Sequence, residues 1–264
     1  MTRPIITLTT DFGLKDSYAA EMKAVILSIS PNVVIVDVSH EIEKFNIRMG
    51  AYVLASAAPY FPKGTVHVAI VDPGVGTRRR PIVILTNRSI YVGPDNGILS
   101  LVAAKEGIEQ IRQITNKKLM MPRISNTFHG RDIFAPVAAH LSKGIPLSQV
   151  GPKIERIQMP SFAKPAKFKN GLLGEIIDID DFGNIVTDIR AEMIKPIAKT
   201  GIVTIMLGKT KTKLTLCNAY AEALKNETIG IIGSHDFLEI AVNQGNASKV
   251  LTAHIGNKVK VYLR

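Results

Sequence analysis

The chain has 264 residues, 46% of them hydrophobic, so it can bury the core of one large domain or two modest ones and falls outside the intrinsically disordered class. Its single cysteine, Cys217, excludes an internal disulfide framework and indicates a reducing compartment, and no apolar run approaches the ~20 residues that a membrane span needs. The formal net charge of +11 divides into +7 over residues 1–160 and +4 over residues 161–264, a spread that argues against a dedicated nucleic-acid-binding surface.

The first half of the chain alternates β-rich runs with helix-like segments. Its N-terminus reaches Asp11 before a signal-peptide core could form, so we expect a soluble, cytoplasmic protein with no membrane partner. Asp16 offers an N-cap to the first helix, and Pro31 ends that helix. The alternation favours an α/β domain with a largely parallel sheet flanked by helices. Strands are predicted at 5–10, 33–39, 65–72, 81–86 and 89–93, and helices at 17–30, 46–61 and 97–107.

Two acidic residues follow predicted strands directly. Asp11 comes after the first strand, and Asp72 opens the stretch "DPGVGTRRR", a tight turn followed by three arginines. Ligands of parallel α/β sheets gather at the carboxyl ends of the strands, so both acids are candidate site residues. Taken alone, each could also be an ordinary turn residue beside a glycine or a proline.

The second half of the chain has a different pattern of residues. Residues 159–170 are rich in Pro and Lys and are predicted to form a linker between an α/β domain at 1–158 and a smaller domain at 171–264. Short strand-like runs with one helix-like segment at 219–225 indicate a β-barrel-like architecture for the smaller domain. These runs lie at 172–180, 184–189, 202–207, 213–216, 229–233, 238–242 and 258–263.

Several familiar site motifs are missing from the sequence. The first strand is not followed by the GxGxxG of a dinucleotide site, "GKT" at 208–210 lacks the earlier glycine of a phosphate loop, and no HExxH or thiolate cluster could hold zinc. We therefore expect no metal and no cofactor. The basic runs at 78–80, 117–118 and 209–213 contain no aromatic residue, whereas single-strand-binding patches usually interleave the two, so we expect a solvated basic surface and no nucleic-acid partner.

Five polar motifs remain, in a fixed order along the chain. They are "TTDFGLKDSY", "VDPGVGTRRR", "NTFHGRD", "DDFGN" and "GSHDFLEIAVNQGNA". Together they resemble the S-adenosylmethionine (SAM) hydroxide adenosyltransferase family, the adenosine-forming SAM hydrolases, whose halide-using relatives are the fluorinases and chlorinases. The resemblance implies an α/β N-terminal domain, a β-barrel C-terminal domain and a homotrimer. It also implies that SAM is held between the N-terminal domain of one subunit and the C-terminal domain of its neighbour.

The resemblance further implies a reaction and three catalytic residues. Water displaces methionine from the 5′ carbon of SAM, giving adenosine and L-methionine. The carboxylate, arginine and histidine that position the water correspond to Asp72, Arg79 and His129. The sulfonium is already a good leaving group, so the task left to the protein is to deliver water in line with the carbon–sulfur bond. Arg79 can hold the carboxylate in place, because its guanidinium is always charged.

Substrate-binding roles follow from the same resemblance. Asp11 corresponds to the ligand of the ribose hydroxyls, and Phe182 and Asn184 correspond to residues on the adenine side. The spacing before "FGN" leaves open whether Asp180 or Asp181 is the relevant acid. The remaining binding residues by resemblance are Ser234 and Glu239 near the methionine portion and Ala247 at adenine.

Other functions remain open from the sequence. A chlorinase-like relative would use a halide in place of water, although an arginine and a histidine at Arg79 and His129 favour water by the resemblance. A non-catalytic SAM or adenosine sensor would bind without turnover and would not need the acid, arginine and histidine. A nucleic-acid-binding protein is supported only by the charge.

Overall fold

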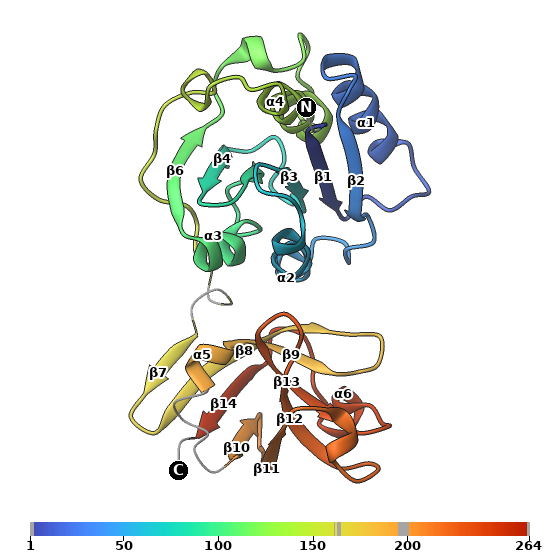
Figure 1. The fold of residues 1–264 in the computed structure, drawn as a ribbon, viewed down its shortest axis with the longest axis vertical. Coiled ribbons are helices and arrows are strands. Elements are labelled where there is room, and N and C mark those ends of the chain that lie inside the picture. Colours follow the sequence, from blue (N-terminus) through green and yellow to red (C-terminus); the bar gives the residue numbers. More distant parts are fainter. Residues whose placement is uncertain (1–2, 161, 163–164, 195–200, 263–264) are drawn as a thin grey trace. The chain divides into compact units, whose positions relative to one another are not determined.

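The structure is a computed structural model that describes residues 3–160, 162, 165–194 and 201–262. The chain forms two compact units, Met1–Met159 and Pro160–Arg264, which are described separately (Figure 1). Among the described residues, no helix combines the length and the apolar character needed to span a bilayer.

The first unit is built on a six-stranded sheet in the order β2-β1-β3-β5-β4-β6 (Figure 1). Strands β2, β1, β3 and β5 pair in parallel, whereas β4 pairs antiparallel with both β5 and β6. The sheet is therefore mixed, and the expectation of a largely parallel sheet is wrong. The strands are β1 (Ile5–Thr10), β2 (Val34–Ser39), β3 (Val66–Ile70), β4 (Pro81–Thr86), β5 (Ile90–Pro94) and β6 (Ile108–Gln113).

The short connection between β4 and β5 explains the antiparallel pair. Only residues 87–89 separate the two strands, and the backbone N–H of Thr86 donates to the carbonyl of Ser89, so the chain turns back on itself. A parallel pair would need a crossover of a dozen or more residues. Strand β6 was not predicted at all, because its sequence IEQIRQ is polar and its burial is mostly partial.

Helices cover the sheet of the first unit. Helices α1 and α4 pack against each other, and their apolar side chains share one core with β1 and β3. Helix α2 packs against β1, β2 and β3 and contacts α3. Strands β2 and β3 lie on opposite sides of β1. Because crossovers between parallel strands are right-handed, α1 and α2 lie on opposite faces of the sheet. The helices are α1 (Tyr18–Ile29), α2 (Ile47–Ala57), α3 (Ser100–Glu106) and α4 (Ala135–Ser142).

The second unit is a closed β-barrel of seven strands, which confirms the barrel-like prediction. The strands follow the order β14-β10-β11-β12-β13-β9-β8, and antiparallel pairing of β14 with β8 closes the ring. Strand β7 pairs with the first three residues of β8, outside the ring. The strands are β7 (Ala166–Phe168), β8 (Gly171–Ile179), β9 (Ile185–Arg190), β10 (Ile202–Leu207), β11 (Thr210–Cys217), β12 (Thr228–Ile232), β13 (Phe237–Val242) and β14 (Lys258–Tyr262), with the short helices α5 (Ala191–Ile194) and α6 (Ala247–Val250).

Three local expectations differ from the structure. Asp16 is not the N-cap of α1; that position is held by Ser17, whose hydroxyl donates to Glu21 one turn later. The helix expected at 219–225 is only a 3-10 turn, Tyr220–Glu222. Strand β7 lies inside the segment predicted as a linker, because its backbone finds partners on β8.

Candidate active site

The first unit has its topological switch point at β1. The chain leaves β1 for β2 on one side and returns to β3 on the other, so loops diverge at the carboxyl ends of β1 and β3. Thr10 and Ile70 are register partners on these strands, and Asp11 and Asp72 follow them by one and two residues. The register therefore brings the two acids to the same edge of the sheet, where open α/β sheets bind ligands.

The turn after Asp72 is shaped by Gly76, which adopts a left-handed φ of 75°. A Cβ at this position would lie 2.3 Å from the carbonyl oxygen of Asn126, so only glycine allows the two loops to approach. The hydroxyl of Thr77 donates to the carbonyl of Gly74 at 2.7 Å and tightens the turn. This packing brings the loop that ends at Arg79 against the loop that precedes His129.

Arg79 connects the other two catalytic candidates. Its Nε lies 3.0 Å from both carboxylate oxygens of Asp72, and its Nη2 lies 2.5 Å from Oδ2. The same Nη2 lies 2.7 Å from Nδ1 of His129. The side chains of Arg79 and Asp72 are only 8% and 6% exposed, so this charged pair is shielded from water. The guanidinium also lies over the ring of Phe134, 5.2 Å from its centroid.

His129 stands immediately before a π-helical turn, Gly130–Phe134, that leads into α4. Its side chain makes no capping hydrogen bond. Burial lowers the pKa of the imidazole, and the positive charge of Arg79 lowers it further. Single π turns within helices occur frequently at functional sites, because they re-aim side chains relative to an ordinary α-helical register.

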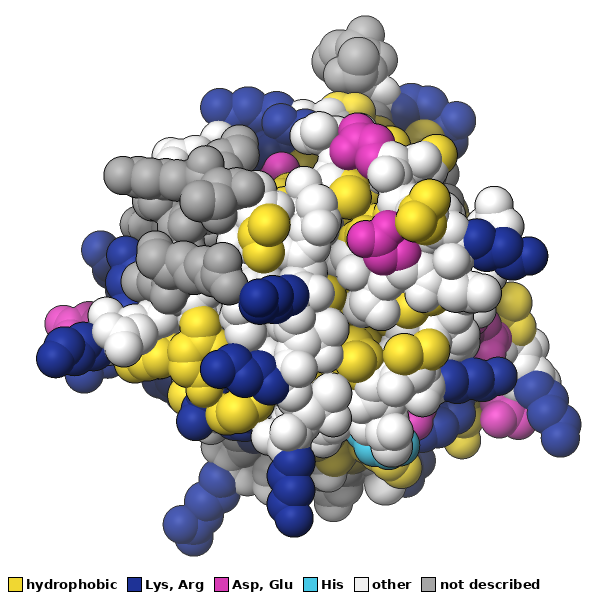
Figure 2. Space-filling model, turned by 90° about the horizontal axis from the view of Figure 1, so that it is seen from below, with side chains coloured by type: hydrophobic (Ala, Val, Ile, Leu, Met, Phe, Trp, Pro, Cys, Tyr) yellow, Lys and Arg dark blue, Asp and Glu magenta, His cyan; other side chains and the backbone are white. Residues whose placement is uncertain are grey.

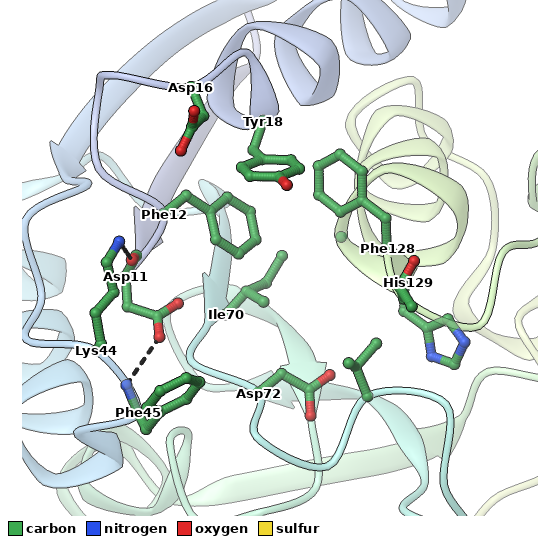
Figure 3. A pocket seen from close by; sticks show the side chains of 13 residues that line it. Asp11, Phe12, Asp16, Tyr18, Lys44, Phe45, Ile70, Asp72, Phe128 and His129 are labelled. Carbon is green, nitrogen blue, oxygen red and sulfur yellow. Dashed lines mark hydrogen bonds between the residues drawn. The ribbon is translucent and has the colours of Figure 1, made fainter.

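Asp72 and His129 line a pocket of about 390 Å³ together with Asp11 (Figure 3). Three rings, Phe12, Tyr18 and Phe128, form part of its wall and meet edge to face, with centroids 5.1 to 5.9 Å apart. Arg79 is not part of the lining and lies behind Asp72 and His129. The pocket therefore combines an apolar aromatic wall with a polar edge, a usual composition for a small-molecule site.

Asp11 fixes the opposite edge of this pocket. Its Oδ2 accepts a hydrogen bond from the backbone N–H of Phe45 at 3.0 Å, and its carbonyl accepts one from the ammonium of Lys44 (Figure 3). Phe45 has a left-handed φ of 66°, which is uncommon for a bulky residue and is held here by the contact with Asp11. Phe45 is 69% exposed and lines the pocket, as does Asp16.

The second unit carries a separate pocket of about 730 Å³, lined by Phe182, Asn184 and Tyr220 among others. Phe182 is 80% exposed. Asp180 accepts hydrogen bonds from the backbone N–H and the side-chain amide of Asn184, at 2.8 and 2.9 Å, and it lines the pocket. Asp181 is exposed and outside the lining, so the geometry distinguishes the two acids before "FGN".

Glu239 lies beside this pocket without lining it. The hydroxyl of Tyr220 donates to its Oε2 at 3.4 Å, and its carboxylate packs against Gly233, where a Cβ would collide with it. Burial raises the pKa of Glu239, and the nearby carboxylate of Asp180 raises it further. Ser234 is exposed in the turn that follows Gly233.

Comparisons with known proteins agree with this arrangement of two units. The model of the SAM hydroxide adenosyltransferase N-terminal domain matches residues 6–151, and that of the C-terminal domain matches residues 174–260. The chain belongs to the SAM hydroxide adenosyltransferase family. The resemblance inferred from the five motifs is thereby confirmed.

Relatives of this family match nearly the whole chain. Proteins named (R)-S-adenosyl-L-methionine hydrolase are 39% identical in Methanocaldococcus jannaschii, over 97% of this chain and 95% of the relative, and 34% identical in Salinispora tropica, over 98% and 97%. The crystal structure of an uncharacterized conserved protein from Thermotoga maritima superposes with a TM-score of 0.87 at 40% identity, covering 98% of this chain and 99% of that chain. A fluorinase of an Actinoplanes species is more distant, at 28% identity over 91% of both chains.

The structure of this family member places the sequence-predicted residues in two groups. Asp11, Asp72, Arg79 and His129 lie together in the first unit, and Phe182 and Asn184 line the pocket of the second. Ala247 is fully buried at the start of α6 and does not line the pocket, although Asn246 directly before it does. Within the described residues, no group of three or more His, Cys, Asp or Glu side chains is placed to hold a metal ion.

Sequence reasoning missed several residues that line the two pockets. Phe12, Tyr18 and Phe128 stand inside the quoted motifs but carry no signal of their own, because an aromatic residue next to an apolar run is ordinarily core. Asp16 was interpreted as a helix cap. Lys44, Phe45 and Tyr220 stand outside every motif, and only the fold brings them to the pockets.

Proposed function

We propose that the chain hydrolyses SAM to adenosine and L-methionine. One observation carries the proposal: Arg79 joins Asp72 and His129 at the polar edge of a pocket that lies at strand ends. The names of the full-length relatives support the same reaction. Because those names specify the (R) sulfonium, we propose that epimer as the first substrate to test.

The geometry supports a division of roles among the three residues. A guanidinium has no acceptor, so Nδ1 of His129 must accept from Arg79, and the neutral imidazole then carries its hydrogen on Nε2. Asp72 is therefore the group available to take a proton from the attacking water. The water oxygen forms a bond to the 5′ carbon, the carbon–sulfur bond breaks with its electron pair going to methionine, and the proton passes to Asp72.

Electrostatics favour this reaction in a partly dry pocket. The sulfonium is cationic, so Asp11, Asp16 and Asp72 in the lining complement the charge of the bound substrate. That charge is lost as the bond to sulfur breaks, and a pocket with little water favours a step in which charge is lost. The aromatic wall of Phe12, Tyr18 and Phe128 limits the water around the reacting carbon. Positioning of well-oriented reactants can supply up to ~7–11 kcal/mol of the barrier reduction.

We propose the binding roles as follows. Asp11 accepts from the ribose hydroxyls with the oxygen that Phe45 leaves available, and Phe182 and Asn184 of the second unit bind adenine. Ser234 and Glu239 bind the methionine portion, and the backbone of Ala247 contacts adenine. Each pocket offers only part of these groups, and we propose, as the family resemblance implies, a homotrimer in which different subunits complete one site. The protein would act in the cytoplasm without a metal or cofactor.

The decisive experiment is chromatography of products after incubation with each sulfonium epimer of SAM, with and without chloride. We expect adenosine and methionine in equal amounts from at least one epimer, unchanged by chloride, and none from the Asp72→Asn variant. A 5′-chloro nucleoside would indicate a halide-using enzyme, and tight SAM binding with no product would indicate a sensor. Either result would overturn the proposed hydrolysis.

A further inference from the structure

The outer surface of the barrel segregates charge. Strands β11 and β14, which flank β10, carry four lysines and no acidic residue. A space-filling view of one face shows many dark blue Lys and Arg side chains and few magenta acids, with some basic side chains beside yellow hydrophobic ones (Figure 2). The four lysines are Lys211, Lys213, Lys258 and Lys260.

Strand register arranges these lysines in rows on the outside of the barrel. The alternate residues of β10, β11 and β14 are buried in the barrel core, so the lysines point outward. Met206 pairs with Lys211 on one side and Lys260 on the other, and Thr204 pairs with Lys213 on one side and Tyr262 on the other. Neighbouring strands lie about 4.8 Å apart and alternate residues along a strand about 7 Å apart, so the lysine side chains are regularly spaced.

The same register inserts aromatic rings among the lysines. The ammonium of Lys211 lies 5.5 Å from the ring centroid of Tyr262, and the ring of Phe168 meets Tyr262 edge to face at 5.8 Å. Gly171 separates the two rings as the register partner of both. A Cβ on Gly171 would lie 2.7 Å from the ring of Phe168 and 2.0 Å from the carbonyl oxygen of Val261, so glycine permits the ring pair to form.

Most of this charge is not neutralised by acidic side chains. Lys258 pairs with the buried carboxylate of Glu175. Within the part of the chain that the structure describes, Lys211, Lys213 and Lys260 make no ion pair. A shallow pocket of about 300 Å³ opens beside them, lined by Met206, Gly208, Asn257, Lys258 and Lys260. The surface is thus suited to an anionic partner with repeated charges.

We propose that this lysine–aromatic face, made of Phe168, Lys211, Lys213, Lys260 and Tyr262, binds single-stranded nucleic acid. Lysines neutralise successive phosphates, and exposed bases stack against the ring pair, the combination by which β-barrel proteins hold single strands. Binding is sequence-independent, because none of the five residues that make up the face carries an amide or a guanidinium that could read base edges. Between the lysines lie the half-buried Met206 and the buried Thr204, so the described part of the face offers no continuous exposed apolar surface for insertion into a membrane.

This proposal differs from the expectation drawn from the linear sequence. The run "KTKTK" contains no aromatic residue, but strand pairing places Tyr262 of β14 and Phe168 of β7 next to it. The face uses no residue of either substrate pocket, so it is independent of the proposed hydrolysis.

The test is fluorescence anisotropy of the full-length protein with a labelled 12-nucleotide oligo-U RNA or oligo-dT DNA, titrated at 50 and 200 mM salt. We expect single strands to bind more tightly than a duplex of the same length. The Lys211→Glu/Lys260→Glu variant should weaken binding at least tenfold and reduce the slope of log affinity against log salt by roughly 1.4, at ~0.7 per phosphate contact. Tyr262→Ala should weaken binding about 5- to 150-fold by removing a stacking surface.

The matched control is Lys63→Glu/Lys117→Glu, which changes net charge equally through two exposed lysines of the first unit. It should retain nearly full affinity, and far-UV circular dichroism should show both double variants folded. The proposal is overturned if the control weakens binding as much as the face variant does. It is also overturned if a duplex binds equally well, or if the face variant instead loses only binding to phosphatidylserine vesicles.

Discussion

Nη2 of Arg79 lies 2.7 Å from Nδ1 of His129, and the same guanidinium donates to both carboxylate oxygens of Asp72. One cation thus fixes both the orientation of the Asp72 carboxylate and the neutral form of the imidazole. The tautomer with hydrogen on Nε2 is the only neutral form that can accept at Nδ1. The site is organised around Arg79, although Arg79 itself does not line the pocket.

The first prediction concerns the pH dependence of adenosine release. Burial and the charge of Arg79 lower the pKa of His129, so the neutral, active imidazole persists below pH 6.5 and is lost only at more acidic pH. The rate should therefore stay level through pH 6.5 and fall below it. In Arg79→Gln the acid limb should move to higher pH, because the repelling charge is gone. Profiles of kcat against pH and an NMR titration of His129 measure the pKa of the imidazole in the wild type and in Arg79→Gln. An acid limb at the same pH in both proteins would contradict the effect of Arg79 on that pKa.

The second prediction separates the charge of Arg79 from its shape. Lysine keeps the positive charge but cannot donate to both Asp72 and His129 in a fixed fork, so Arg79→Lys should lower kcat roughly 10²- to 10³-fold with little change in KM. Arg78→Lys is the matched control, because Arg78 is the exposed neighbour in the same turn. Steady-state kinetics on both variants test the prediction. Near-normal kcat in Arg79→Lys would show that charge alone suffices.

Much of this site could be predicted from the sequence, because it depends on motifs that keep their order. Asp11 and Asp72 were placed at strand ends from alternation alone, and the structure puts them at one sheet edge. The barrel was likewise indicated by its short apolar strands. These features are local, so a sequence pattern contains them.

The features that were missed depend on contacts between distant segments. Phe45 reaches the first pocket only because Asp11, 34 residues earlier, holds its backbone in a left-handed conformation. Strand β6 is polar and is recognised as a strand only once β4 lies beside it. Tyr262 of β14 lies beside Lys211 of β11 because both strands pair with β10. No periodicity within one segment encodes such partners.

The third prediction concerns the base that the second pocket accepts. The side-chain amide nitrogen of Asn184 donates to Asp180 at 2.9 Å, which leaves Oδ1 as the acceptor for an exocyclic amine. A substrate with hypoxanthine in place of adenine presents a carbonyl there and should lose roughly 10- to 100-fold in kcat/KM. The Asp180→Ala variant frees the amide to turn, so this preference should shrink. Competition between the two substrates measures it, with Asp181→Ala as the control at an exposed acid.

The fourth prediction concerns the stability of the barrel. Burial raises the pKa of Asp188 to about 7, above ~3.9 in an unfolded chain. The folded state therefore keeps a proton that the unfolded chain releases, so the free energy of unfolding decreases as pH rises from about 4 through 7. Asp188→Asn should remove this loss and stabilise the protein at pH 8 by up to about 4 kcal/mol. Urea unfolding at pH 5 and pH 8 tests the sign, and a wild-type stability that rises over this interval would oppose it.

The fifth prediction tests how the two catalytic loops are held together. In Gly76→Ala the new methyl group would lie 2.3 Å from the carbonyl oxygen of Asn126, and the left-handed φ of 75° would be strained as well. Gly64→Ala is a matched control, because its φ is 87° but nothing lies within 4 Å of the added carbon. Both variants should lose about 1 kcal/mol from backbone strain, while only Gly76→Ala should also separate Arg79 from His129.

We therefore expect Gly76→Ala to lower kcat at least tenfold beyond Gly64→Ala, with substrate affinity changed much less, since misplacement of a reacting group by about 1 Å can cost ~10²-fold. Thermal unfolding of both variants separates this effect from general destabilisation. The NMR titration of His129 gives a second readout, because an imidazole that has lost its contact with Arg79 should titrate at a higher pH. Equal kcat in the two glycine variants would mean that the approach of the loops at Asn126 does not set the geometry of the site.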